Sequence, residues 1–377
     1  MKIVHVLPAL TKGGAERVVV ELANHAVANG HEVTVLPAVP WPAHLLADRL
    51  RPEVKLRFIQ PNGRHWRQAY VRLAPWMLRN RAWLLDQDII HCHLTIGSVF
   101  GTLMQGIRRL SGRRTPAVVE TYHAVGMAIP ASSRAGHALL LGTRDGAALM
   151  AEDPYWKAFL ARHPDKPFRI IPNGIAPPPP PLASSAYQAA AGIPDRAFVV
   201  GSVGRLVAER RPGLLLDAFA RLIFKSRENL HLLLAGDGPE RALLAETARD
   251  LGISSRVHLP GLATDAAEPL ALIDLYWTVN VGPVTGIAAL EAAFAGLPIV
   301  AVQLDLHHRT TAKDWIWSAA DPAQVAEHTA ALIADRPAMG ALGKKQQAYA
   351  RAHHSVEAMA AAYERLYDEA LALRRAS

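Results

Sequence analysis

Two arginines follow a short apolar run in the second half of the chain, where they could hold an anion. Gly204 and Arg205 come directly after the run Ala197–Val203, and Arg210 lies five residues beyond Arg205. Guanidinium groups bind a diphosphate in fork geometry and offset its charge. Loop arginines are also commonly solvated and nothing more, so the motif alone leaves both interpretations open.

A second candidate site is the segment from Pro283 to Glu291. The turn at Gly286 precedes a short helix-like apolar run, and the N-terminus of a helix there would favour an anion. Glu291 stands among alanines in that run and therefore needs a polar partner. That partner is either a ligand or another group of the protein.

The first half has its own candidates. Gly13 and Gly14 precede a predicted helix, where they either bring backbone N–H groups to an anion or simply form a tight turn. His123 follows a predicted strand and could reach a ligand or cap the sheet. His91 and His93 share one face of a strand, and a structural pair is favoured over a metal site because no third ligand has a recognisable spacing.

Strand-like and helix-like runs alternate along both halves of the chain. Repeated βα units predict parallel sheets whose ligands bind beyond the carboxyl ends of the strands. The proline run 176–181 predicts a linker. We therefore expect an α/β protein with two doubly wound, Rossmann-like domains that face a cleft. The domains would span residues 1–175 and 176–354, with a C-terminal helix at 355–377 that packs back on the first.

Composition and charge exclude several classes of protein. Half of the residues are hydrophobic, which excludes a disordered chain, and the single cysteine, Cys92, excludes a disulfide framework. The net charge is +8, divided into +10 over residues 1–170 and −2 over the rest. The basic first half is typical of proteins that bind nucleic acid, anionic lipid or phosphorylated ligands. We expect neither a membrane span nor a signal peptide, because no apolar run is long enough.

The stretch 64–85 interleaves arginines with aromatic residues. This pattern is typical of a membrane interface, but a nucleic-acid surface or an ordinary surface helix would also account for it. The candidate membrane-binding residues are Arg64, Trp66, Arg67, Arg72, Trp76, Arg79 and Trp83.

Several motifs taken together resemble the retaining GT-B glycosyltransferases of family 4, the glycosyltransferase group 1 type. Each motif is weak alone, but their order and spacing over some 360 residues are specific. They are GGAERVVVELA at 13–23, IPNGI at 171–175, VGRL at 203–206, AGDGPER at 235–241, VHLPG at 257–261, GIAALEAAFAGLPIVA at 286–301 and YERLY at 363–367.

This resemblance implies a role for each matched position. His123 would lie near the anomeric carbon, Gly13 and Gly14 would border the acceptor and the donor phosphates, and Arg205 would hold the diphosphate. Arg210 stands where the family usually has lysine. The implied donor-binding residues are Gly204, Arg205, Arg210, Pro260, Gly261, Leu262, Pro283, Val284, Thr285, Gly286, Ile287 and Glu291.

One departure from the family pattern concerns its two acids spaced E-x7-E. Glu291 matches the second acid, which would bind the ribose hydroxyls, but Pro283 occupies the position of the first. Relatives use that first acid to hydrogen-bond hydroxyls of the donor sugar. We therefore expect a less hydroxylated donor, such as a deoxy or acylamino sugar, since apolar side chains cannot hydrogen-bond the additional hydroxyl groups of an ordinary hexose. A non-catalytic paralogue that binds a nucleotide sugar or a partner enzyme is the alternative.

The resemblance leads to a functional expectation. The protein would transfer a sugar from a UDP- or GDP-sugar to a hydroxyl acceptor with retention, without a metal or cofactor. A lipid-linked saccharide acceptor and an anionic membrane surface would be its partners, in the assembly of lipopolysaccharide, O-antigen, capsule or glycolipid. The location would be cytoplasmic, on the inner face of the cell membrane. A nucleic-acid partner is not expected, because it would not explain the phosphate-site motifs, and an epimerase would need acid and base residues that we do not identify.

Overall fold

The structure is a computed structural model of the 377-residue chain. Lys12 and several other segments lie outside its description, as do the side chains of Trp66, Arg67 and Ala376. The described residues are 1–11, 13–40, 46–63, 66–109, 111, 115–123, 142–152, 163–263, 265–281, 284–304 and 315–376.

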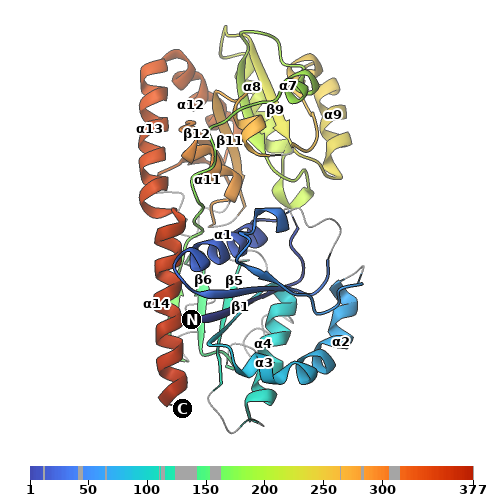
Figure 1. The fold of residues 1–377 in the computed structure, drawn as a ribbon. Coiled ribbons are helices and arrows are strands. Elements are labelled where there is room, and N and C mark those ends of the chain that lie inside the picture. The colour runs from blue at the N-terminus through green and yellow to red at the C-terminus, as the bar shows by residue number, and fades with distance from the viewer. Residues whose placement is uncertain are drawn as a thin grey trace. The chain divides into compact units, whose positions relative to one another are not determined.

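The chain forms two compact units, each with its own parallel sheet. Unit 1 comprises Met1–Ala176 together with Val356–Ser377, and unit 2 comprises Pro177–Ser355. Figure 1 shows α14 in red as the last element of the chain, in unit 1 with the blue and green N-terminal strands.

Unit 1 contains a seven-stranded sheet in the order β3-β2-β1-β4-β5-β6-β7. Its elements are β1 (Lys2–Leu7), α1 (Gly14–Ala28), β2 (Glu32–Pro37), η1 (Ala47–Arg49), β3 (Lys55–Leu56), α2 (Trp66–Arg79), α3 (Arg81–Leu85), β4 (Ile89–His93), α4 (Leu94–Arg109), β5 (Ala117–Tyr122), β6 (Gly146–Leu149), β7 (Phe168–Ile170) and α14 (Val356–Ala376).

The two faces of this sheet bury different side chains. Val4, Val6 and Cys92 pack with α2 and α4 in one apolar core. Because successive strand residues point to opposite faces, His5, His91 and His93 face the other side, which α1 and α14 cover. The register pairs His5 with His91 across β1 and β4. Three histidines therefore share one face of the sheet.

Unit 2 contains a six-stranded sheet in the order β10-β9-β8-β11-β12-β13. Its elements are α7 (Ser185–Ala191), β8 (Phe198–Val203), η2 (Ala208–Arg210), α8 (Gly213–Ile223), β9 (Leu230–Ala235), α9 (Glu240–Asp250), η3 (Ser254–Arg256), β10 (Val257–His258), α10 (Ala267–Leu270), β11 (Leu275–Asn280), α11 (Ile287–Phe294), β12 (Ile299–Gln303), β13 (Trp317–Ala319), α12 (Pro322–Ala334) and α13 (Arg336–His353).

The core of unit 2 lies between this sheet and the helices α8 and α12. Phe219 of α8 and Val325 of α12 pack against Trp277 of β11, which is fully buried. The Trp277 indole donates a hydrogen bond to Thr329 (3.0 Å), so its one polar atom is satisfied. Helices α11 and α13 pack against each other and contact β12.

The predicted βα pattern is confirmed at most elements. Strands and helices alternate in both units, and the C-terminal helix expected at 355–377 is α14. Helices α12 and α13 were not predicted individually. Within the described part of the chain, no helix is long and apolar enough to cross a membrane.

Candidate functional site

Three glycine-containing loops meet at the carboxyl edge of the unit 2 sheet. Gly204, Gly236 and Gly261 each follow the end of a strand, namely β8, β9 and β10. The backbone N–H of Gly204 bonds Ala235 O, and that of Gly236 bonds Gly261 O (2.9 Å each). A Cβ on Gly236 would lie 1.8 Å from the carbonyl oxygen of Gly204, so this close approach of two loops requires glycine.

The two predicted arginines follow the first of these loops along the chain. Arg205 and Arg210 are both exposed, at the end of β8 and in η2. Although the Arg210 side chain as a whole is exposed, partial desolvation of its guanidinium lowers its pKa, and the positive charge of Arg205 lowers it further. Nη1 of Arg210 lies 4.0 Å from the position that a Cβ on Gly286 would take. Gly286 is the N-cap of α11 and no side chain caps that helix end. Two guanidinium groups and a helix N-terminus therefore favour an anion at one place.

The Tyr276 hydroxyl lies at the same edge of the sheet, within electrostatic reach of Glu291. Its buried hydroxyl donates to Val203 O and accepts from Val203 N–H (3.2 Å each). Burial raises the pKa of Tyr276 to about 12; the Glu291 carboxylate acts in the same direction, and the Arg210 charge acts against both. Glu291 is 9% exposed. The carboxylate and the guanidinium thus lie within electrostatic reach of one hydroxyl group at the end of β8.

The other residues predicted to bind the donor lie along the same edge or in α11. Leu262 is exposed, Pro260 and Val284 are half-buried, and Ile287 opens α11. Thr285 is buried, and its hydroxyl oxygen has no hydrogen-bond partner among the residues described. Pro283, on which the expectation about the donor sugar depends, lies outside the described residues.

The glycine turn of unit 1 holds a carboxylate of the protein itself. Gly13 is the N-cap of α1, and Gly14 is its first residue. A Cβ on Gly13 would lie 2.0 Å from Oε2 of Glu16. The other oxygen of that carboxylate, Oε1, accepts a hydrogen bond from the Thr11 hydroxyl (2.8 Å). A phosphate bound at this helix N-terminus would therefore have to displace Glu16.

His123 belongs to a row of hydrogen-bonded imidazoles that the sequence did not predict. Its Nε2 bonds Nδ1 of His93 (3.0 Å), and Nε2 of His93 bonds Nδ1 of His5 (3.1 Å). We call His5, His93 and His123 the histidine chain. The rings come from β1, from β4 and from the residue after β5, so only the parallel pairing of these strands brings them together.

Burial keeps these imidazoles neutral. It lowers the pKa of His5 and of His123 to about 3. It also lowers the pKa of His93 and of His91 well below the usual value, and the neighbouring histidines lower both further. Each ring therefore carries one N–H and one bare nitrogen at neutral pH.

His91 makes a separate set of hydrogen bonds. Its Nδ1 bonds the hydroxyl of Tyr367 and its Nε2 bonds that of Thr121, both at 2.7 Å. Thr121 in turn bonds the hydroxyl of Tyr363 (2.8 Å), so the set ties α14 to the sheet. Nitrogens of His5, His91 and His93 lie within 4.8 Å of one another, close enough to share a metal ion. Because both nitrogens of His91 are already engaged, a structural role fits it better.

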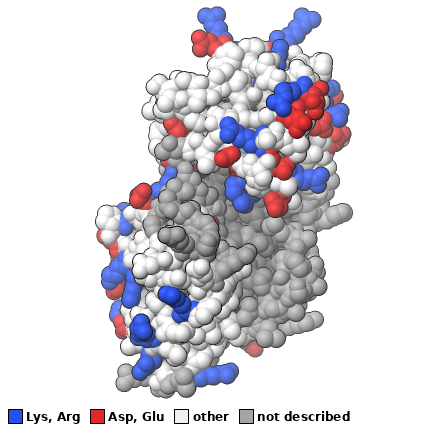
Figure 2. All heavy atoms as spheres, turned by 90° about the vertical axis from the view of Figure 1, so that its right-hand side faces the viewer, with Lys and Arg blue, Asp and Glu red and all other residues white. Residues whose placement is uncertain are grey.

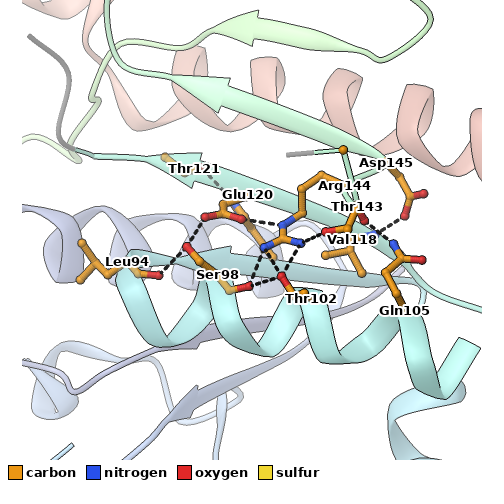
Figure 3. Close-up of polar contacts among 12 residues, drawn as sticks. Leu94, Ser98, Thr102, Gln105, Val118, Glu120, Thr121, Thr143, Arg144 and Asp145 are labelled. Atoms are coloured by element: carbon orange, nitrogen blue, oxygen red, sulfur yellow. Dashed lines mark hydrogen bonds and ion pairs between the residues drawn. The ribbon is translucent and has the colours of Figure 1, made fainter. Parts of the chain in front are cut away.

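A second polar cluster lies on the opposite face of the same sheet. Figure 3 shows the Arg144 guanidinium between the Glu120 carboxylate of β5 and the Ser98 carbonyl group of α4. Nε of Arg144 bonds the Glu120 carboxylate (2.5 Å), and Nη2 bonds the Ser98 carbonyl (2.6 Å). Both ionic groups are almost fully buried. Glu120 is thus engaged in a buried ion pair with Arg144.

A cavity of about 650 Å³ adjoins this cluster, at the amino ends of β6 and β7. Arg108, Lys166 and Arg374 contribute positive charge to its lining. The strand ends that carry His123 lie at the other edge of the sheet, so this cavity is not the site outlined above.

The described part of the basic aromatic stretch forms α2 and α3, and two of its tryptophans, Trp76 and Trp83, pack against the core. Trp76 and Trp83 are half-buried against the core, with ring centroids 6.2 Å apart. Val71 and Leu78 stand out from α2, 83% and 50% exposed, beside the exposed Arg72 and Arg79. The side that carries α2 is seen in Figure 2, where Lys and Arg form small groups on a largely uncharged surface. Arg64 and the side chains of Trp66 and Arg67 are outside the description.

Solved structures share this architecture over the whole chain. HepE from Anabaena, in complex with UDP and glucose, superposes with a TM-score of 0.73 at 18% identity, covering 97% of this chain and 98% of that one. Two parallel α/β units of this kind are the GT-B fold of glycosyltransferases.

Family models identify the chain more closely. Residues 12–177 match the model described as Glycosyltransferase Family 4, and residues 197–335 match Glycosyl transferases group 1. The chain therefore belongs to the family 4, group 1 glycosyltransferases.

Curated relatives match either over a short part of the chain or over most of it at lower identity. The lipopolysaccharide core biosynthesis glycosyltransferase LpsE of Rhizobium meliloti is 36% identical over 110 residues, which is 29% of this chain and 31% of LpsE. The D-inositol 3-phosphate glycosyltransferase of Corynebacterium efficiens is 26% identical over 308 residues, covering 76% of this chain and 72% of that protein. The match to LpsE thus spans about a third of that relative.

Proposed function

We propose that this protein transfers a sugar from a nucleoside-diphosphate sugar to a hydroxyl acceptor. The observation that carries the proposal is the position of the Arg210 guanidinium, 4.0 Å from the Cβ position of Gly286, with Arg205 beside it and Glu291 in the same helix. A diphosphate placed there would meet two guanidinium groups and the N-terminus of α11, and Glu291 would bind the ribose. The UDP bound to the structurally similar HepE supports a nucleotide ligand.

Our proposed mechanism is electrostatic stabilisation of the leaving diphosphate. Negative charge builds on that group as the anomeric carbon becomes oxocarbenium-like, and the fixed cations of unit 2 would stabilise it without a metal ion. His123 would contact the transferred sugar, and the configuration at the anomeric carbon would be retained. Turnover that is unaffected by a chelator, and a product with the donor's anomeric configuration by NMR, are the expected results.

Nucleotide binding is the first test of this proposal. We expect one of UDP, GDP, dTDP, ADP and CMP to raise the melting temperature by several degrees, because a ligand at 100 times its Kd adds about 2.7 kcal/mol. Glu291→Gln should reduce that shift, whereas Glu246→Gln, at an exposed position of α9, should not. If none of the five changes the melting temperature, the donor site is not functional.

The donor sugar and the catalytic competence depend on position 283. Because proline replaces an acid of the family pattern there, we propose a deoxy or acylamino sugar as donor. Efficient turnover of UDP-glucose or GDP-mannose would refute that choice of sugar. Nucleotide binding without turnover of any donor would instead favour the non-catalytic alternative.

For the acceptor we propose a lipid-linked saccharide reached at an anionic membrane, as in lipopolysaccharide or other cell-surface polysaccharide and glycolipid assembly. The name of the relative LpsE and the exposed face of α2 support this. Vesicles containing anionic lipid should bind the protein more strongly than neutral vesicles. A double Arg72→Gln, Arg79→Gln variant should lose that preference, and Arg227→Gln with Arg249→Gln, the same charge change in unit 2, should keep it. Equal binding to both kinds of vesicle would refute the membrane contact.

A further inference from the structure

One end of the histidine chain is open. Nδ1 of His123 is buried and has no hydrogen-bond partner among the residues described, whereas its Nε2 is bonded to His93. Buried polar atoms are normally satisfied, and one left unsatisfied at the end of a strand is available to a bound group. The histidine chain therefore leads from the interior of unit 1 to a ring nitrogen that no described residue bonds.

We propose that His93 and His5 are positioning residues for His123, and that the three rings form one hydrogen-bonded unit that holds the His123 ring and fixes its tautomer. This inference rests on the proposed role of His123 near the transferred sugar. In this arrangement the two inner histidines touch no substrate. They act only through the hydrogen bonds His5–His93 and His93–His123.

The coupling follows from counting protons. A neutral imidazole has one donor and one acceptor, and each of the two bonds in the chain needs one of each. If His5 donates to His93, then His93 donates to Nε2 of His123, and Nδ1 of His123 carries its N–H. If the direction is reversed, Nδ1 of His123 is the bare acceptor. All three rings must therefore change tautomer together, and a ligand group at Nδ1 selects one direction for the whole chain.

The surroundings support such a neutral chain. The His91 ring lies closest, with its centroid 4.0 Å from that of His93, and burial keeps it neutral too. Beyond it, the same face presents Thr121, Tyr363 and Tyr367. Burial raises the pKa of both tyrosines, so their hydroxyl groups stay protonated. His91 and these three hydroxyl groups are thus uncharged at neutral pH.

His91 provides a matched control. It is as buried as His93 and lies on the same strand, but its hydrogen bonds go to Thr121 and Tyr367 and not to His123. His91→Phe and His93→Phe therefore remove the same kind of group from the same layer. Only the second breaks the histidine chain.

The test is nitrogen-15 NMR of the ring nitrogens in histidine-labelled full-length protein, with signals assigned by their loss in single variants. In the unmodified protein we expect His123 and His93 each to show one protonated and one bare nitrogen, in head-to-tail order. In His93→Phe the His123 ring should become a mixture of tautomers, and in His91→Phe it should be unchanged. An unchanged His123 in His93→Phe would refute the inference, and so would one equivalent of zinc in the purified protein, since a metal would replace the hydrogen bonds.

Kinetics add a second readout. Misplacing a reacting group by about 1 Å can cost on the order of 10² in rate, so His93→Phe should lower kcat about 10- to 100-fold. The KM for the donor should change little, because the proposed nucleotide site lies in unit 2. If the unmodified protein binds no nucleotide, the proposed function is refuted but the inference about the histidine chain is not. The NMR result still decides whether His93 and His5 fix the tautomer of His123.

Discussion

The strand ends of unit 1 and unit 2 present different polar groups, although both sheets are built from the same βα repeats. Unit 2 presents Arg205 and Arg210, which are exposed and permanently charged. Unit 1 presents His123 at the end of a row of buried rings that burial keeps neutral. Two chemistries are thus separated between the units.

This difference fits the two demands of a sugar transfer from a diphosphate. A leaving group that gains negative charge is stabilised by cations that are already in place. A carbon that gains positive character is better served by a neutral group, because a nearby cation would oppose the developing charge. The comparison yields four predictions, from the largest expected effect to the smallest.

Acid should destabilise unit 1 strongly. His5 and His123 have a pKa of about 3 when folded and about 6.5 when unfolded, so the unfolded chain binds more protons between these pH values. Stability then falls as the pH drops from 6.5 towards 3, by about 1.4 kcal/mol per pH unit for each such histidine. Hydrogen exchange of peptides from β1 and β4, corrected for the intrinsic rate and compared with β8 and β9, measures this. His91→Phe should make the dependence shallower, and an identical slope in that variant would contradict the prediction.

Removing Arg205 should affect turnover more than stability. Loss of one group that stabilises a developing anion typically costs about 10²–10³ in kcat. We expect that loss for Arg205→Ala in steady-state assays, with an unchanged melting temperature because the side chain is exposed. Arg227→Ala, another exposed arginine of unit 2, should retain full activity. Equal rates for both variants would remove Arg205 from the mechanism.

A side chain at Gly236 should force the unit 2 loops apart. The new Cβ would meet the Gly204 carbonyl oxygen at 1.8 Å, and such overpacking costs about 1–3 kcal/mol. Gly236→Ala should therefore lower the free energy of unfolding in urea and weaken nucleotide binding. Gly252→Ala is the matched control, because the new Cβ would meet no described atom within 4 Å. Only the backbone cost of a side chain at a φ of +68°, about 1 kcal/mol, then remains. Gly252→Ala should bind nucleotide as tightly as the unmodified protein. Equal weakening of nucleotide binding in Gly252→Ala and Gly236→Ala would show that the steric argument is wrong.

Removing one hydroxyl from α14 should have the smallest effect. Tyr367→Phe leaves Nδ1 of His91 without its partner and should cost about 1 kcal/mol of unfolding free energy. Tyr187→Phe in unit 2 should cost less, because that buried hydroxyl has no hydrogen-bond partner within the described chain. Urea unfolding measures the free energy of unfolding of both variants. A larger decrease in Tyr187→Phe than in Tyr367→Phe would contradict the prediction.

Local pattern was enough to predict the strands of unit 2 and the glycine loops that follow them. A glycine after an apolar run, followed by arginine, specifies both the close approach of the loops and the charge above them, so Gly204 and Arg205 could be found from adjacent residues alone. The C-terminal helix was likewise predictable, because Tyr363 and Tyr367 lie on one face at helical spacing.

The histidine chain depends on information that spacing does not contain. His5 and His93 are 88 residues apart, and the register of β1 against β4 decides that they meet. The sequence reasoning treated His91 and His93 as one pair, but the structure divides them between two sets of hydrogen bonds. Side-chain direction was equally hidden, since the pattern of 64–85 did not reveal that Trp76 and Trp83 turn inward.

The return of α14 to unit 1 makes unit 2 an insertion in the topological sense. The chain leaves unit 1 at Ala176 and re-enters it at Val356, and the Val356 N–H bonds the Ile175 carbonyl oxygen (3.0 Å). The two cut ends are therefore already neighbours. Residues 177–355 form a continuous segment that could be excised and the gap closed by a short loop, whereas the fragment 1–176 alone would lack the helix that covers Thr121 and His91.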